Sequence, residues 1–144
     1  MVKKTGLSAK ISVIEGNSAL AVARFESDRP NNITTPVGTR LALAGAGSAG
    51  VTLLAQISPE EAALSLKDLK PEQRQALLRE AVKARRTGLA RSYGTHDPAI
   101  CALSVPLEMD RPAALSLVGW PEDFSTNEKR KRQENAIVRF RDSR

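Results

Sequence analysis

LALAGAGSAGVTLLA, residues 41–55, contains no charged residue and passes from small residues into an aliphatic run. This order is typical of a strand that leads through small residues into a buried helix. Gly45, Gly47, Ser48 and Gly50 place almost no side chain above the backbone, which would leave amide groups at the helix start open to a small polar or anionic ligand. Close packing of the helix against a sheet explains the same residues, so both interpretations stay open.

The same glycines match the dinucleotide-binding pattern GxGxxG at Gly45, Gly47 and Gly50. That pattern belongs to a strand, a tight turn and a helix, followed by an acidic residue at the end of a second strand. Here only a short apolar run precedes the glycines, and Asp68 lies in a polar, helical context. We therefore expect no nucleotide and no other cofactor.

The composition describes one domain with an aliphatic core. The chain has 144 residues, of which 41% are hydrophobic and only 3% aromatic. This length is sufficient for a hydrophobic core that needs no disulfide or metal to stabilise it. Its single cysteine, Cys101, excludes an internal disulfide, and its single histidine, His96, excludes a two-histidine metal motif, so no metal site is expected. Neither a membrane-spanning run nor a signal peptide is evident. These features predict a soluble, cytoplasmic protein.

The net charge of +6 invites a nucleic-acid interpretation. Basic residues gather in the cluster from Lys129 to Arg132, and a basic nucleic-acid-binding module that uses this cluster is the alternative function. Aromatic residues do not interleave with the cluster, as a single-strand-binding surface would require. Solvated helix ends and faces are the simpler explanation.

Hydropathy patterns predict an α+β domain with an antiparallel sheet covered by helices. Capping signals start helices at Ser58, at Pro71 and at Ser125, where Glu128 repeats the capping-box spacing, and Gly88 ends the second of these helices. Residues 26–36 are polar and form an exposed loop, in which Ile33 is the only large apolar residue. Strands are expected at residues 7–14, 19–25, 89–93, 100–107 and 112–118, with Pro106 near an edge or a bulge.

Few residues offer catalytic chemistry, and we expect no enzyme. Cys101 and His96, with Asp97 nearby, could form a nucleophile pair, but a lone cysteine within ICALSV is typical of a buried small hydrophobe. Ser104 and Ser116 interrupt apolar strands, and each buried hydroxyl needs a hydrogen-bond partner. If both face the segment of small residues rather than the backbone, they form a small, partly polar pocket.

The order of motifs resembles the effector-binding domain of IclR-type transcriptional regulators. The matching segments are TGLSAKISVIEGNSALAVARFES, VGTRLALAGAGSAGVTLLAQISPEE, the helix that closes on TGLA, ICALSVPLEMD and AALSLVGWPEDFS. The resemblance implies a GAF-like curved antiparallel sheet of five or six strands flanked by helices. It also implies binding of a small organic or aromatic acid and assembly into homodimers or homotetramers. Family members read DNA through an N-terminal winged helix-turn-helix, for which residues 1–144 have no room, so we expect a single effector-binding domain.

The resemblance also assigns pocket positions. The family's small-residue turn falls on Ser48, Ala49 and Gly50, its acid on Ser92 and its cysteine on Ala102. Its two serines on the last strand fall on Ser116 and Val118, and its apolar lid falls on Ile33. Val51 and Ala44 stand where the family has a lysine and, nearby, a histidine. These departures predict a less polar pocket that takes a larger, more apolar acid or no effector.

Overall fold

The computed structural model describes residues 1–33, 35–94 and 97–143, which form an α+β domain. The six strands are β1 (Ser8–Glu15), β2 (Ser18–Phe25), β3 (Arg40–Ala42), β4 (Ala90–Tyr93), β5 (Cys101–Leu107) and β6 (Ala113–Gly119). The α-helices are α1 (Val2–Thr5), α2 (Gly47–Leu54), α3 (Pro59–Ser65), α4 (Pro71–Thr87) and α5 (Asn127–Asp142). Two short 3₁₀ helices are η1 (Leu43–Gly45) and η2 (Pro121–Phe124).

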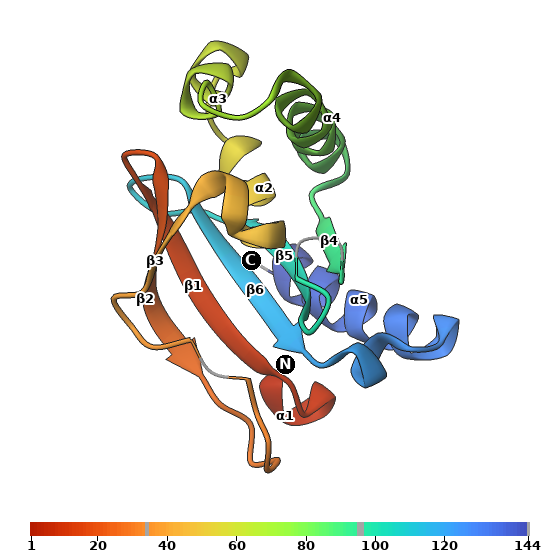
Figure 1. The fold of residues 1–144 in the computed structure, drawn as a ribbon. Coiled ribbons are helices and arrows are strands. Elements are labelled where there is room, and N and C mark those ends of the chain that lie inside the picture. Colours follow the sequence, from red (N-terminus) through yellow and green to blue (C-terminus); the bar gives the residue numbers. More distant parts are fainter. Residues whose placement is uncertain (34, 95–96, 144) are drawn as a thin grey trace.

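One curved sheet organises the domain, with strand order β3-β2-β1-β6-β5-β4 and antiparallel pairing throughout. Helix α2 packs on β4, β5 and β6 from one side, and α4 packs on α2. Helix α5 packs on β5 from the other side (Figure 1). The predicted fold class, a curved antiparallel sheet flanked by helices, is confirmed.

The two-residue period of the strands divides the core into two layers. On β5 and β6, odd-numbered residues such as Leu103, Leu115 and Leu117 point toward α5, where they pack with Phe124 and Ile137. Even-numbered positions of these two strands point toward α2 and α4 and include small residues as well as polar ones. This second face is therefore where a polar site can form.

Helix α2 is the most deeply buried helix, because every residue from Ser48 to Leu54 is buried. A Cβ added at Gly50 would lie only 2.1 Å from the carbonyl oxygen of Leu43. No side chain fits at that distance, so Gly50 allows the helix to approach η1. Close packing thus explains this glycine.

Most predicted helix boundaries are confirmed. Ser58 and Glu61 form the expected capping box, α4 begins at Pro71, and Gly88 ends α4 with a left-handed φ of 72°. Strand β5 is an edge strand near Pro106, because its pairing with β4 extends no further than Ser104.

The predicted cap of the last helix is wrong by one residue. Ser125 adopts a right-handed helical conformation at the end of η2. Thr126 is extended, and its hydroxyl accepts the Lys129 amide at 3.1 Å. A cap residue needs that extended backbone. No helix within the described residues is long and apolar enough to cross a membrane.

Candidate functional site

A cavity of about 150 Å³ lies between the N-terminal end of α2 and the sheet. Six of the residues expected at a pocket line it: Ser48, Ala49, Ser92, Ala102, Ser116 and Val118. Lys10, Leu41, Asp97 and Ile100 also line it, together with the small residues 45–47. The structure therefore brings together residues from α2, β1, β4, β5 and β6.

Strand register explains why these side chains meet. Lys10 on β1 lies opposite Ser116 on β6, and Ser116 lies opposite Ser104 on β5. Directly opposed residues project on the same face of a sheet. Two residues along, Val118, Ala102 and Ser92 form a second row on that face. The two rows form the floor of the cavity, and α2 lies above them.

Three buried hydroxyls form a continuous hydrogen-bonded chain. The Ser48 and Ser104 Oγ atoms are 2.8 Å apart, and the Ser104 and Ser116 Oγ atoms are 2.6 Å apart. Ser104 and Ser116 therefore face the segment of small residues and bond to side chains rather than to the backbone. This arrangement is the partly polar pocket that the sequence left as one of two alternatives.

The hydroxyl chain can offer one proton to the cavity. Each serine hydroxyl carries one proton and can accept two hydrogen bonds, and the two hydrogen bonds use two of the three protons. When Ser104 donates to one neighbour and accepts from the other, the remaining proton belongs to Ser48 or Ser116, both of which line the cavity. In these arrangements the chain presents one O–H donor to a ligand that carries an acceptor.

Lys10 supplies a positive charge that no pocket assignment from the sequence includes. Its partly buried side chain lines the cavity, and burial lowers the pKa of its ammonium group below the usual value. Within the described part of the chain, no carboxylate forms an ion pair with it. Strand β1 thus provides a cation to the cavity although Val51 provides none, and the less polar pocket expected from the sequence stays a prediction.

The N-terminal end of α2 adds further donors. Ala46 precedes the helix and no side chain caps it. The first amides of a helix have no partner within the helix, and the helix dipole makes this end positive. Asp97 contributes a carboxylate to the lining of the cavity, and its Oδ1 accepts a hydrogen bond from the Ala99 amide at 2.9 Å.

Two residues assigned to the pocket lie outside it. Gly50 packs against Leu43, as described above. Ile33 is partly buried in a small neighbouring depression, which it shares with Lys10 and Val118. Ile33 is thus beside the cavity, and the described loop does not place it over the opening.

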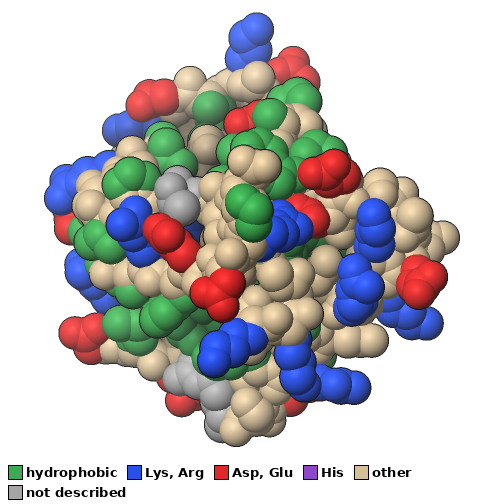
Figure 2. All heavy atoms as spheres, turned by 90° about the horizontal axis from the view of Figure 1, so that it is seen from below, with side chains coloured by type: hydrophobic (Ala, Val, Ile, Leu, Met, Phe, Trp, Pro, Cys, Tyr) green, Lys and Arg blue, Asp and Glu red, His purple; other side chains and the backbone are tan. Residues whose placement is uncertain are grey.

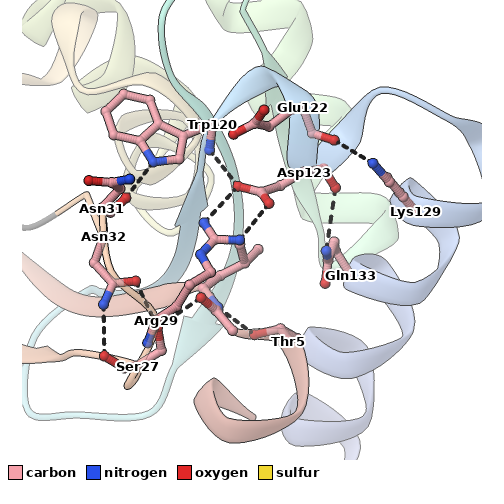
Figure 3. Close-up of polar contacts among 12 residues, drawn as sticks. Thr5, Ser27, Arg29, Asn31, Asn32, Trp120, Glu122, Asp123, Lys129 and Gln133 are labelled. Atoms are coloured by element: carbon pink, nitrogen blue, oxygen red, sulfur yellow. Dashed lines mark hydrogen bonds and ion pairs between the residues drawn. The ribbon is translucent and has the colours of Figure 1, made fainter.

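The loop that carries Ile33 is fixed to η2 (Figure 3). Arg29 donates two hydrogen bonds to the Asp123 carboxylate, at 2.7 and 3.0 Å, and the Trp120 indole donates to the Asn31 carbonyl oxygen at 2.6 Å. Burial raises the pKa of Asp123, but the hydrogen bonds from Arg29 and the Trp120 amide lower it by more, and the net shift is downward. Asp123 is therefore held as a carboxylate.

The basic cluster from Lys129 to Arg132 does not act as one patch. The Lys129 ammonium donates to the Glu122 carbonyl oxygen at 3.0 Å, and the Arg130 guanidinium donates to the Phe124 carbonyl oxygen at 2.7 Å. Arg130 also lies over the Tyr93 ring. On the face in Figure 2, basic and acidic side chains are interspersed. Two of the four basic side chains of the cluster thus bind backbone carbonyl groups of the domain itself, which weakens the nucleic-acid alternative.

Cys101 does not have the surroundings of a nucleophile. It is buried, and burial raises the pKa of its thiol, which disfavours the reactive thiolate. His96, the possible partner of Cys101 in a nucleophile pair, lies outside the described residues. Groups of acidic residues, cysteine and histidine that could hold a metal ion are not found within the described ranges.

Residues 1–140 match a protein family described as "Bacterial transcriptional regulator IclR C-terminal". A search of curated proteins found no match. A putative IclR transcriptional regulator from Silicibacter is a similar solved structure, with a TM-score of 0.83 and 20% identity over 95% of this chain and 57% of that one.

Two further structures are similar at comparable coverage. An IclR-family regulator from Rhodococcus has a TM-score of 0.77 and 27% identity, over 89% of this chain and 51% of that one. An IclR homologue from Microbacterium hydrocarbonoxydans, complexed with 4-hydroxybenzoate, has a TM-score of 0.75 and 23% identity, over 94% of this chain and 59% of that one.

The chain spans slightly more than half of each of these three solved proteins. Because the family match covers nearly all of its residues, the chain belongs to the IclR family of bacterial transcriptional regulators, of which it represents the C-terminal, non-enzymatic regulator domain.

Proposed function

We propose that this domain senses a small organic acid, which binds in the cavity between α2 and the sheet. Lys10 carries the proposal, because a partly buried ammonium group without a carboxylate partner in the described structure favours an anionic ligand. The hydroxyl of Ser48 or Ser116, where Ser104 donates to the other serine, and the uncapped amides of α2 are suitable donors for the same carboxylate.

The size of the cavity limits the rest of the ligand. An apolar cavity of about 150 Å³ accommodates benzene, and this cavity has a similar volume. Leu41, Ile100 and Val118 provide apolar surface for a ring or a short aliphatic chain. The related structure that contains 4-hydroxybenzoate supports an aromatic acid as one member of this class.

The remaining steps of regulation extend the proposal beyond this domain. A ligand that prefers one of two arrangements of a dimer or tetramer shifts the population toward that arrangement. DNA recognition would belong to a separate winged helix-turn-helix domain in the cytoplasm. The ligand would then change the binding of DNA by changing how the sensing domains assemble.

A thermal-shift screen tests the proposal with benzoate, 4-hydroxybenzoate, short aliphatic acids and the corresponding amides. We expect at least one acid to raise the melting temperature by mass action. Its amide should have a smaller effect, because an amide carries no charge for Lys10.

A cavity-filling variant locates the binding. Ala102→Leu places a larger side chain in the cavity and should abolish the shift, whereas Ala99→Leu, at an exposed position of the adjacent turn, should retain it. An acid that stabilises both variants equally would place binding elsewhere. Failure of every acid in the panel would contradict the proposed ligand class.

A further inference from the structure

An apolar trough of about 490 Å³ lies on the other side of the sheet from the cavity. Its side chains come from α1, β1, β2, the β5–β6 hairpin and α5, and they include Val2, Ile11, Phe25, Met109, Leu115 and Phe140. Phe25 and Met109 are about half exposed, at 49% and 50% of their surface. Exposed apolar side chains that gather in this way mark interaction surfaces.

The trough continues into a basic groove of about 770 Å³ between α1 and α5. Met1 and Phe140 line both hollows. Four cations, Lys4, Lys131, Arg132 and Arg139, line the groove, and Glu128 is the carboxylate of its lining. None of the four makes a side-chain hydrogen bond or an ion pair with another described residue, whereas the neighbouring Lys129, Arg130 and Arg141 do.

We infer that the trough and the basic groove together form a docking surface for an acidic amphipathic helix of a partner protein. Such a helix presents an apolar stripe beside an acidic face, which matches an apolar hollow that is continuous with a row of unpaired cations. Apolar anchors in the trough would supply affinity, and the charges would supply orientation and a faster encounter.

The composition of the surface disfavours two other occupants. A nucleic-acid backbone would use the cations but leave the aliphatic side chains of the trough exposed to water. A second copy of this chain, related by a twofold axis, would add the same four cations to the interface again and only Glu108 and Glu128 of the lining to balance them, because an isologous interface uses the same patch on both subunits. An acidic helix satisfies both the charges and the apolar side chains.

Fluorescence anisotropy with synthetic helical peptides tests this inference. The probe is a labelled peptide of about five turns, with leucine on one stripe and glutamate on the opposite face. We expect it to bind the wild-type chain, and a scrambled peptide of the same composition to bind at least about tenfold more weakly because it lacks the stripe.

Matched variants separate specific docking from general attraction. Arg132→Glu with Arg139→Glu should weaken binding at least about tenfold, while Lys83→Glu with Arg86→Glu, an equal charge change on exposed residues of α4, should leave it nearly unchanged. Phe25→Ser, which alters the trough without changing the charge, should also weaken binding.

Four results would overturn the inference. The scrambled peptide could bind as tightly as the amphipathic one, or the α4 variant could lose as much affinity as the α5 variant. A single-stranded oligonucleotide could instead displace the peptide and depend on the same residues, which would identify a nucleic-acid surface. Self-association that is lost in the α5 variant, measured by sedimentation, would show that a second copy occupies the groove.

Discussion

Lys10 gives the cavity its charge, and its position depends on strand pairing. In the sequence it is one polar residue of an alternating strand, and nothing local distinguishes it from a solvated lysine. The pairing of β1 with β6 places it opposite Ser116, on the face that α2 covers. A prediction from single residues misses it, because register is a property of two strands.

Lys10→Met should weaken the binding of any acid found in the screen by about 10- to 100-fold, the usual range for a lost hydrogen bond to a charged group. Calorimetric titration measures this change. Lys67→Met, at an exposed position, should retain affinity. An acid that binds both variants with equal affinity would show that Lys10 does not contact the ligand.

The lowered pKa of Lys10 predicts the effect of pH on stability. Between that lowered pKa and the ordinary value of 10.5, the unfolded chain holds the proton and the ligand-free folded chain releases it. The contribution of Lys10 to the free energy of unfolding therefore rises with pH in this window. Denaturant titrations of wild type and Lys10→Met should differ in this slope, and identical slopes would contradict the assignment.

Gly50 and Gly45 provide a matched pair within the segment of small residues. A Cβ at Gly50 would clash with the Leu43 carbonyl oxygen, whereas a Cβ at Gly45 meets nothing within 4 Å. Gly50→Ala should therefore destabilise the domain by about 2 kcal/mol or more, and Gly45→Ala should change stability by less than about 0.5 kcal/mol. Urea unfolding measures both, and equal effects would refute the packing explanation.

The loop from β2 and the 3₁₀ helix η2 form one unit through Arg29 and Asp123. Their two hydrogen bonds join segments that are far apart in the sequence, and Asp123 also accepts the Trp120 amide at 2.9 Å. The sequence predicted an exposed polar loop here, but it gave no partner for Arg29. Long-range ion pairs have no local signal, which is why this attachment could not be predicted.

Asp123→Asn should destabilise the domain at neutral pH by about 1–3 kcal/mol, since Arg29 loses its charged acceptor. The net lowering of the pKa of Asp123 means that its contribution is present above the unfolded pKa and is lost as pH falls through the lowered folded pKa. The variant should lack this acid-dependent component. Asp110→Asn, on the exposed turn between β5 and β6, is the control, and a similar loss of stability there would contradict the role of Asp123.

The curved sheet separates two surfaces of the whole domain, the cavity under α2 and the trough beside α5. The alternation of strands such as ICALSVPL predicted both the sheet and its buried serines, because a period of two is readable along one strand. Capping residues such as Ser58 and Gly88 marked helix ends. The cavity could not be predicted in the same way, because it depends on where α2 approaches three separate strands.

The central claim is that a small acid binds at the N-terminal end of α2, and an NMR titration of the isotope-labelled domain tests it most directly. With millimolar benzoate or 4-hydroxybenzoate, the largest amide shifts should occur at Gly47, Ser48 and Ala49 and at their neighbours on β6, Ser116 and Val118. Lys10→Met should reduce these shifts. Shifts that cluster on α5 instead, or an unchanged spectrum with every acid of the screen, would contradict the claim.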